Sequence, residues 1–171
     1  MAARTPSQTV GPFFHEGLRW DEGHKVTFAE KGRPVAVFGR VLDGAGEPVA
    51  DALIETWQRC ATGVIGTSAS EGRPHGFGRV STGADGTFRI ETTMPGGRAP
   101  FLDVTIHARG LLKAVRTRVY LADEGQVRAD PLLAPLAGSP RVATLVARLT
   151  RDDQFQWDVR LQGEGETVFF C

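Results

Sequence analysis

Apolar residues along this chain recur mainly at the two-residue spacing of β-strands, and glycine or proline separates one run from the next. Residues 35–42 predict a strand that is buried on both faces for part of its length. Residues 52–57 predict a second strand, and residues 102–108 and 115–121 predict two more. Residues 155–161 alternate Phe, Trp, Val and Leu with polar residues, which predicts an amphipathic strand.

Turn residues mark the connections between these strands. The Asp-Gly pair at residues 85–86 stands between residues 79–82 and 87–92, which predicts that these two segments form a β-hairpin. Residues 61–78 are rich in glycine and lack a period, so we expect a long loop there. The Ser-Pro pair at residues 139–140 is compatible with the start of either a short helical turn or a strand.

These elements amount to about eight short strands, with no long helix and no internal repeat. The pattern predicts an all-β fold, an antiparallel β-sandwich with an irregular N-terminal arm and long loops; a collapsed barrel is the alternative. We expect one domain over residues 1–171, with residues 1–34 as the extended arm. The arm carries Phe13, Phe14 and Trp20, so it either packs on its own domain or anchors a partner.

Composition narrows the classes of function. The 171 residues include 20 Lys plus Arg and 20 Asp plus Glu, and zero formal charge argues against a nucleic-acid binder held by a basic face. The 21 glycines and 10 prolines suit a turn-rich β protein better than a helical bundle. No apolar run is long enough to span a bilayer, and the first residues lack the apolar segment of a signal peptide. We therefore expect a cytoplasmic protein.

Residues that commonly carry chemistry are sparse. Cys60 and Cys171 are too few for a disulfide framework or a four-cysteine zinc site, and we interpret both as reduced thiols. His75, His107 and Asp103 are conceivable Fe(II) ligands. Asp103 and His107 are four residues apart on one predicted strand, however, which separates them by about 13 Å at the usual rise. Ordinary surface or core roles therefore compete with the metal-site interpretation.

Arg109 is a further candidate, because it lies in the connection between two predicted strands and is followed by Gly110. Glycine lets the backbone turn freely, and the planar guanidinium suits recognition of a carboxylate. A loop arginine is also commonly just solvated, and spacing alone does not decide between the two roles.

Eight stretches distributed over the chain form a recognisable set. They are Thr5–Phe13, Val41–Gly44, Ala52–Gln58, Gly76–Arg79, Asp85–Phe88, Ala108–Leu112, Thr117–Tyr120 and Leu161–Phe170. Together they resemble the intradiol ring-cleavage dioxygenases, and the last stretch is typical of alpha rather than beta chains in that family. The resemblance covers nearly the whole chain and is weakest at residues 18–34 and 60–75.

The resemblance implies chemistry at an Fe(III) ion that two tyrosines and a His-x-His pair hold. The positions that match the histidines are Phe101 and Asp103, and those that match the tyrosines fall near Ile65 and Arg98. The single tyrosine of this chain, Tyr120, lies in a different strand. The resemblance thus implies that this chain supplies no metal ligand and no catalytic residue.

For an alpha-type chain, the resemblance places the iron in a partner beta subunit of the same fold, with the active site between the two chains. The alpha-type chain lines the substrate side. The matching substrate-binding positions here are Thr9, Gly11 and Pro12 in the arm, together with Arg109, whose guanidinium would face a substrate carboxylate. The implied reaction cleaves 3,4-dihydroxybenzoate with O2 to 3-carboxy-cis,cis-muconate.

Two other functions stay open at this point. One is a non-catalytic β-sandwich interaction module derived from the same family, although the joint presence of Arg109 and the arm residues favours an enzyme subunit. The other is a self-sufficient metalloenzyme that uses His75, His107 and Asp103.

Overall fold

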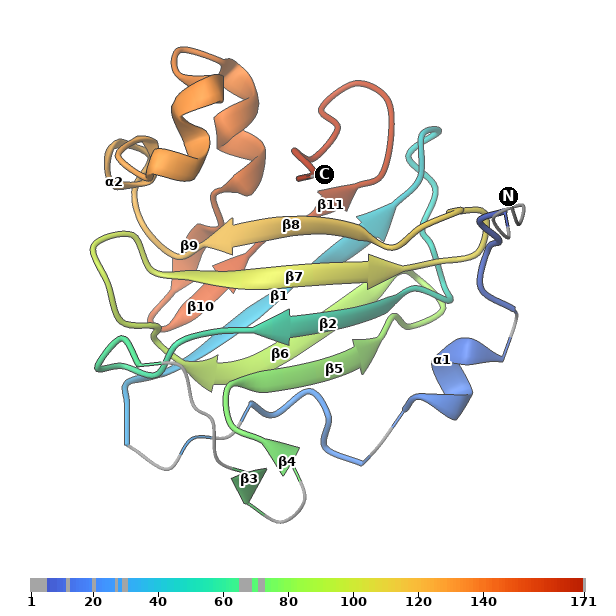
Figure 1. Cartoon of the computed structure of the whole chain (residues 1–171), viewed down its shortest axis with the longest axis horizontal. Helices are drawn as coiled ribbons and strands as arrows, with labels where there is room; N and C mark the ends of the chain where they lie inside the picture. Colours follow the sequence, from blue (N-terminus) through green and yellow to red (C-terminus); the bar gives the residue numbers. More distant parts are fainter. Residues whose placement is uncertain are drawn as a thin grey trace, which may run out of the picture.

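The computed structural model describes residues 6–11, 13–19, 21–26, 28, 31–64, 69–70 and 73–170. Two β-sheets packed in layers form the centre of the fold, and the short helices of residues 124–145 gather at one end of it (Figure 1). The all-β sandwich that the sequence predicts is therefore confirmed. Among these residues, no helix is long and apolar enough to cross a membrane.

The first sheet is built around β1 (Pro34–Leu42), which pairs antiparallel with β6 (Thr87–Thr93). On its other side, β10 (Gln154–Gln156) and β11 (Val159–Arg160) run parallel to β1. The edge strand β9 (Arg148–Arg151) pairs antiparallel with β10. Parallel pairing with β1 is a feature that alternation alone does not show, because it leaves strand direction undetermined.

The second sheet is antiparallel throughout and has the order β5-β2-β7-β8. Its strands are β5 (Phe77–Ser81), β2 (Leu53–Trp57), β7 (Phe101–His107) and β8 (Val115–Tyr120). Between β2 and β5, the short pair β3 (Ala69–Ser70) and β4 (Arg73–Pro74) interrupts the segment expected to be loop.

The main core lies between the two sheets and follows the pleat of the strands. On β7, Leu102, Val104 and Ile106 are buried, whereas Asp103 between them is exposed. On β1, residues 35–37 are buried in succession, as the sequence predicts for a strand covered on both faces. Burial of these aliphatic side chains stabilises the fold by roughly 1.5–3 kcal/mol each.

The predicted hairpin between residues 79–82 and 87–92 is wrong. Strand β5 pairs with β2 and strand β6 pairs with β1, so the two segments belong to different sheets. The turn itself forms, since the Gly83 N–H donates to the Thr87 carbonyl at 2.8 Å. It acts as a corner that carries the chain from one sheet to the other.

The Ser-Pro pair at residues 139–140 begins a helical turn rather than a strand. The Ser139 hydroxyl oxygen accepts a hydrogen bond from the Arg141 N–H at 3.2 Å, and the 3₁₀-helix η2 (Pro140–Leu145) follows. With α2 (Glu124–Arg128) and η1 (Pro131–Leu136), η2 forms a helical cap beside β8. The cap encloses a second buried cluster of Tyr120, Val127, Leu133, Val142, Leu145 and Val168.

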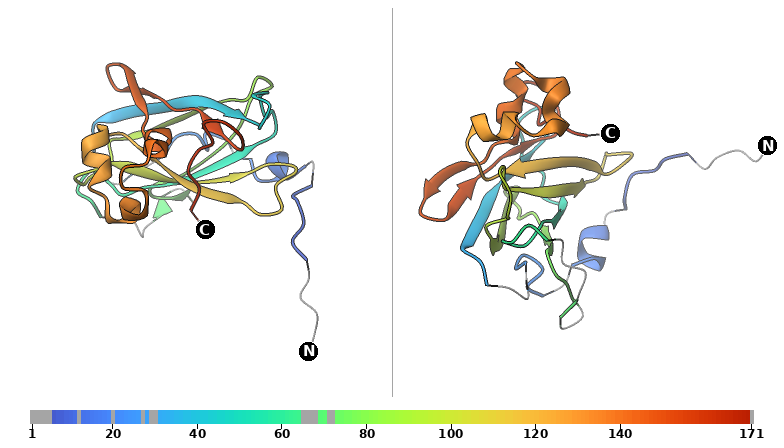
Figure 2. Two further views of the ribbon diagram at one scale, coloured as in Figure 1. Left: turned by 90° about the horizontal axis from the view of Figure 1, so that it is seen from above. Right: turned by 60° about the vertical axis from the view of Figure 1, so that its left-hand side comes forward.

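The N-terminal arm packs on its own domain in one part and leaves it in another. Residues 24–26 lie along β6, where the Val26 N–H donates to the Glu91 carbonyl and the Glu91 N–H donates to His24, both at 2.8 Å. Ahead of the short helix α1 (Phe14–Gly17), residues 6–11 lead away from the sandwich (Figure 2), and Phe13 is 78% exposed. Trp20 lies outside the described residues.

Residues 155–161 fall in the two strands β10 and β11 rather than one, and between these strands the chain passes very close to β1 at Gly39. The Trp157 N–H donates to the Phe38 carbonyl at 2.8 Å. A Cβ atom at Gly39 would stand 1.8 Å from the Trp157 carbonyl oxygen, which is far inside van der Waals contact. Only a residue without a side chain fits this crossing.

The variant Gly39→Ala should therefore lower the free energy of unfolding by about 3 kcal/mol, since a backbone atom blocks the new methyl group. Urea unfolding followed by circular dichroism measures the loss. The control is Gly17→Ala, where a Cβ atom meets nothing within 4 Å; it should change stability by less than about 0.5 kcal/mol. Equal stabilities of the two variants would show that the crossing is not tight.

Candidate functional site

The arm and the loop that follows β7 meet at a hydrogen bond. The Gly110 N–H donates to Thr9 Oγ1 at 2.9 Å, across 101 positions of sequence. Gly110 has a φ of +87°, a left-handed conformation that turns the chain out of β7. The structure thus brings the predicted arm residue Thr9 to the loop that carries Arg109. Gly11 is exposed in the same stretch of arm, and Pro12 lies outside the described residues.

Arg109 comes two residues after the end of β7 and faces an aspartate. Its Nε–H donates to Oδ2 of Asp51. The Arg109 side chain is 61% exposed, whereas that of Asp51 is 15% exposed. Among the described residues, Asp51 is the one hydrogen-bond partner of this guanidinium. The group is thus held at its Nε edge, and its Nη donors have no partner among the described residues.

A groove extends over the outer face of the second sheet, from the end of β7 near Arg109 to η1 of the helical cap. Its lining includes Glu55, Trp57, Asp103, His107, Arg116 and Leu132. Several of its charges are paired with one another. Glu55 accepts from Arg79 at 2.6 and 2.8 Å, and His107 Nε2 lies 3.7 Å from the same carboxylate.

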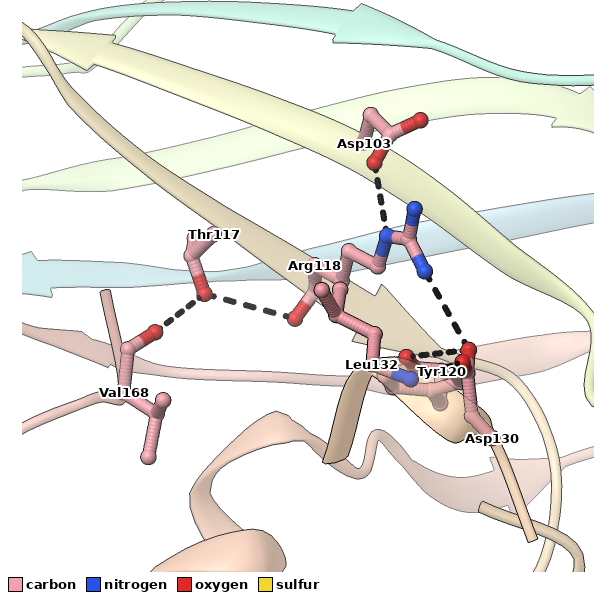
Figure 3. A network of polar contacts seen from close by, with 7 residues as sticks. All are labelled: Asp103, Thr117, Arg118, Tyr120, Asp130, Leu132 and Val168. Carbon is pink, nitrogen blue, oxygen red and sulfur yellow. Dashed lines mark hydrogen bonds and ion pairs between the residues drawn. The ribbon is translucent and has the colours of Figure 1, made fainter. Parts of the chain in front are cut away.

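Arg118 occupies the part of this face where the resemblance places metal ligands. Its Nε–H donates to Asp103 at 2.8 Å, and its guanidinium carbon stands 3.9 Å from the centre of the Phe101 ring. Its Nη1 donates to Asp130 at 3.1 Å (Figure 3). Burial alone would lower the pKa of Arg118, but hydrogen bonds with Tyr120 and Asp103 outweigh it and raise the pKa. The guanidinium therefore stays charged.

Tyr120 and Asp130 connect this network to the helical cap (Figure 3). The Tyr120 hydroxyl donates to Asp130 Oδ2 at 2.8 Å, and the Leu132 N–H donates to Oδ1 of the same carboxylate at 2.9 Å. Tyr120 has no exposed surface. Burial, reinforced by the Asp130 carboxylate and opposed by Arg118, raises its pKa to about 12.

At the positions matched to histidine ligands, Phe101 and Asp103, the described side chains do not fit an iron ion. Within the described part of the chain, no three His, Cys, Asp or Glu side chains lie close enough to share a metal. His75 is buried elsewhere, His107 faces Glu55, and Asp103 binds Arg118. A fixed guanidinium charge at this position repels a second cation.

Two further positions match the tyrosine ligands that the resemblance implies. Arg98 is exposed, and Ile65 lies outside the described residues. The structure therefore does not bring together the set of His75, His107 and Asp103, which the metalloenzyme hypothesis requires.

Sequence reasoning missed Asp51, Arg118 and Asp130. Strand register reveals Asp51, because Leu53 pairs with His107 in the antiparallel ladder and Asp51 therefore stands opposite Arg109. No comparable signal exists for Asp130, which lies in a connection between two helices and meets Arg118 only through the packing of the cap.

Comparison with known proteins gives a consistent result. A family model described as Dioxygenase matches residues 10–101. The chain is 39% identical to the protocatechuate 3,4-dioxygenase alpha chain of Burkholderia cepacia, over 98% of this chain and 96% of that one. It is 34% identical to the alpha chain of the same name from Pseudomonas putida, over 97% and 95% of the two chains.

A beta chain and a solved dioxygenase domain are more distant matches. The beta chain of the Burkholderia cepacia protocatechuate 3,4-dioxygenase is 26% identical, over 80% of this chain and 67% of that one. Among solved structures, the dioxygenase domain of a dioxygenase carbohydrate-binding fusion protein from Streptomyces sp. SirexAA-E superposes with a TM-score of 0.61 at 24% identity. That superposition covers 93% of this chain and 99% of the other, and it shows that the sandwich fold is shared.

The raised pKa of Tyr120 predicts a specific alkaline behaviour. Because the pKa is 10.0 in the unfolded chain and about 12 in the folded one, the folded state keeps its proton while the unfolded state loses it. The free energy of unfolding should therefore fall between pH 10 and pH 12, by on the order of 2 kcal/mol from this group. Since Tyr120 is the single tyrosine, tyrosinate absorbance reports its titration directly.

The matched variant is Tyr120→Phe. At neutral pH it should lose about 1 kcal/mol, the contribution of the hydrogen bond to Asp130. The stability difference from the wild type should shrink and then change sign as the pH rises toward 12, because the wild type alone loses stability through deprotonation of the unfolded tyrosine. A titration midpoint near 10 in the folded protein would contradict the buried, hydrogen-bonded state of this hydroxyl.

Proposed function

The chain belongs to the intradiol dioxygenase family, and from that premise we propose that it is the alpha subunit of a protocatechuate 3,4-dioxygenase. The reaction inserts both atoms of O2 between the hydroxylated carbons of 3,4-dihydroxybenzoate and yields 3-carboxy-cis,cis-muconate. This chain forms part of the substrate pocket wall, and the beta subunit holds the Fe(III). The observation that carries the proposal is the similarity to two alpha chains over nearly their whole length.

The substrate-binding role falls to the junction between the arm and the β7–β8 loop. Protocatechuate carries a carboxylate, which needs a paired cation when it leaves water. The formal charge of the whole chain is zero, so no broad basic field attracts the anion. We assign this role to Arg109, which has donors that Asp51 does not occupy, and to the arm residues Thr9, Gly11 and Pro12, of which Thr9 is bonded to the same loop.

The Arg118 network supports a role without iron for this chain. Where the family resemblance matches histidine ligands, the chain has Phe101 and Asp103, and both contact a permanently charged guanidinium. Such a site favours an anion or an internal ion pair over a metal cation. We therefore propose that the metal chemistry of the complex takes place entirely on residues of the beta subunit.

A partner chain also explains apolar surface near the junction. Phe13 at the base of the arm is 78% exposed, and Leu112 in the β7–β8 loop is 62% exposed. Large apolar side chains of this kind commonly act as interface anchors. Similarity to both an alpha and a beta chain supports a complex of two related subunits. We propose that this region contacts the beta subunit.

The organisation of the chain follows from the same proposal. Residues 1–171 form one domain, with residues 1–34 as its N-terminal arm, and the protein acts in the cytoplasm. The continuous core between the two sheets supports a single domain. Cys60 is a free, buried thiol, which is compatible with a reducing compartment.

Arg109→Ala in the assembled complex should raise KM for protocatechuate with little change for catechol, which lacks the carboxylate. The expected cost is about 1.5–3 kcal/mol in kcat/KM for protocatechuate, the range for a hydrogen bond to a charged group. Steady-state oxygen consumption with the two substrates measures it.

The control for this variant is Arg33→Ala. Arg33 is exposed to a similar degree and also donates through Nε to an aspartate, Asp153, but it precedes β1 in the other sheet. Arg33→Ala should change neither KM nor kcat for protocatechuate or for catechol. Equal losses for protocatechuate and catechol in Arg109→Ala would remove the carboxylate role.

The subunit arrangement predicts where iron is found. The chain purified alone should contain no iron and should not consume protocatechuate. Co-expressed with the beta-type chain of its source organism, it should co-purify as a reddish complex, with the colour arising from tyrosinate-to-iron charge transfer. Metal analysis should give one iron per pair of chains. Iron bound tightly by the isolated chain, or failure to co-purify, would contradict the proposal.

A further inference from the structure

Asp51 stands on a firmly held part of the backbone. The Thr82 hydroxyl donates to the Val49 carbonyl at 2.7 Å and accepts from the Ala52 N–H at 3.0 Å. The Thr82 N–H donates to the Ala52 carbonyl at 2.9 Å. Thr82 is buried, so these bonds fix the residues on both sides of Asp51. The Asp51 carboxylate therefore has little freedom of its own.

Arg109 differs from Asp51 in this respect. Its side chain is largely exposed, and the residue after it is a glycine in the left-handed conformation. An arginine side chain loses up to about 2 kcal/mol of rotamer entropy when it is fixed. Without a local partner, Arg109 would spread over many orientations, and a substrate would have to order it on binding.

The strand register brings the two residues together. Leu53 pairs with His107 at the end of the β2–β7 ladder, and the same register continued by two positions places Asp51 opposite Arg109. Opposite charges at directly facing positions of antiparallel strands attract each other. Asp51 takes the Nε–H, which lies on the edge of the guanidinium nearest the backbone. The two Nη groups remain for a carboxylate ligand.

We propose that Asp51 is a positioning residue that holds the Arg109 guanidinium in the orientation in which it binds the substrate carboxylate. The proposal rests on the proposed function. Asp51 does not touch the substrate, since its carboxylate faces Arg109 and would repel a second carboxylate. The Thr9–Gly110 hydrogen bond fixes the loop backbone, and Asp51 fixes the side chain that the loop presents.

The experiment measures KM and kcat of the assembled alpha–beta complex for protocatechuate and for catechol. In Asp51→Ala, KM for protocatechuate should rise about tenfold, because the guanidinium is no longer pre-oriented. Asp51→Asn, which keeps an acceptor oxygen but not the charge, should show a smaller rise. Both kcat and the KM for catechol should stay unchanged.

A double variant tests whether Asp51 acts through Arg109. If it does, adding Asp51→Ala to Arg109→Ala should not raise KM for protocatechuate beyond the value that Arg109→Ala gives alone. The matched control is Asp153→Asn, which breaks the ion pair with Arg33 in the other sheet. This variant should leave KM and kcat unchanged for both substrates. Thermal unfolding and co-purification of each complex establish that the variants fold. Should Asp51→Ala fail to assemble, Asp51→Asn carries the test.

Each outcome separates the inference from the proposed function. If Arg109→Ala is selective for protocatechuate but the Asp51 variants behave as wild type, the positioning role is wrong. A lower KM for protocatechuate in Asp51→Ala would also overturn it, because Asp51 would then compete with the substrate for Arg109. Equal effects on both substrates would indicate a structural role only. If Arg109→Ala itself is unselective, the proposed carboxylate recognition fails, whatever Asp51 does.

Discussion

The register of β7 against its neighbours is the constraint on which the rest of this structure depends. Its two-residue period directs Leu102, Val104 and Ile106 into the sandwich core and leaves Asp103 outside. The same register sets the charged pairs of the outer face. A slip of one residue would bury a carboxylate and expose the core, so hydrophobic burial fixes the placement of the polar groups as well.

The outer face of this sheet is organised by internal charge pairing. Arg118 joins β8 to Asp103 on β7 and to Asp130, which lies between α2 and η1 of the helical cap, and the Tyr120 hydroxyl donates to the same Asp130. The Arg118 guanidinium, the Tyr120 hydroxyl and the Leu132 N–H all donate to the Asp130 carboxylate. Hydrogen bonds as well as apolar contacts therefore attach the cap to the sheet. The network includes Phe101 and Asp103, which gives these two positions a structural role in this chain.

The junction between arm and loop is the part of the described structure to which we assign the proposed substrate contact. The arm meets the loop at the bond from Gly110 to Thr9, and Arg109 presents its outer edge to solvent beside exposed apolar residues. Neither the cation nor the apolar surface has a complete partner within the described residues. This arrangement agrees with the proposed function, in which a second chain would complete the pocket.

The sequence by itself determined the strand class, most strand positions and the presence of a loop arginine followed by a glycine. It did so because side-chain alternation and turn chemistry are local properties. The tertiary structure alone decided which strands pair, and for that reason the Asp-Gly turn at residues 85–86 became a corner between sheets instead of a hairpin. It alone also decided the partners of Arg109 and Arg118, because Asp51 and Asp130 reach them through strand register and packing of the cap. Register and packing are relations between distant segments, which no local pattern encodes.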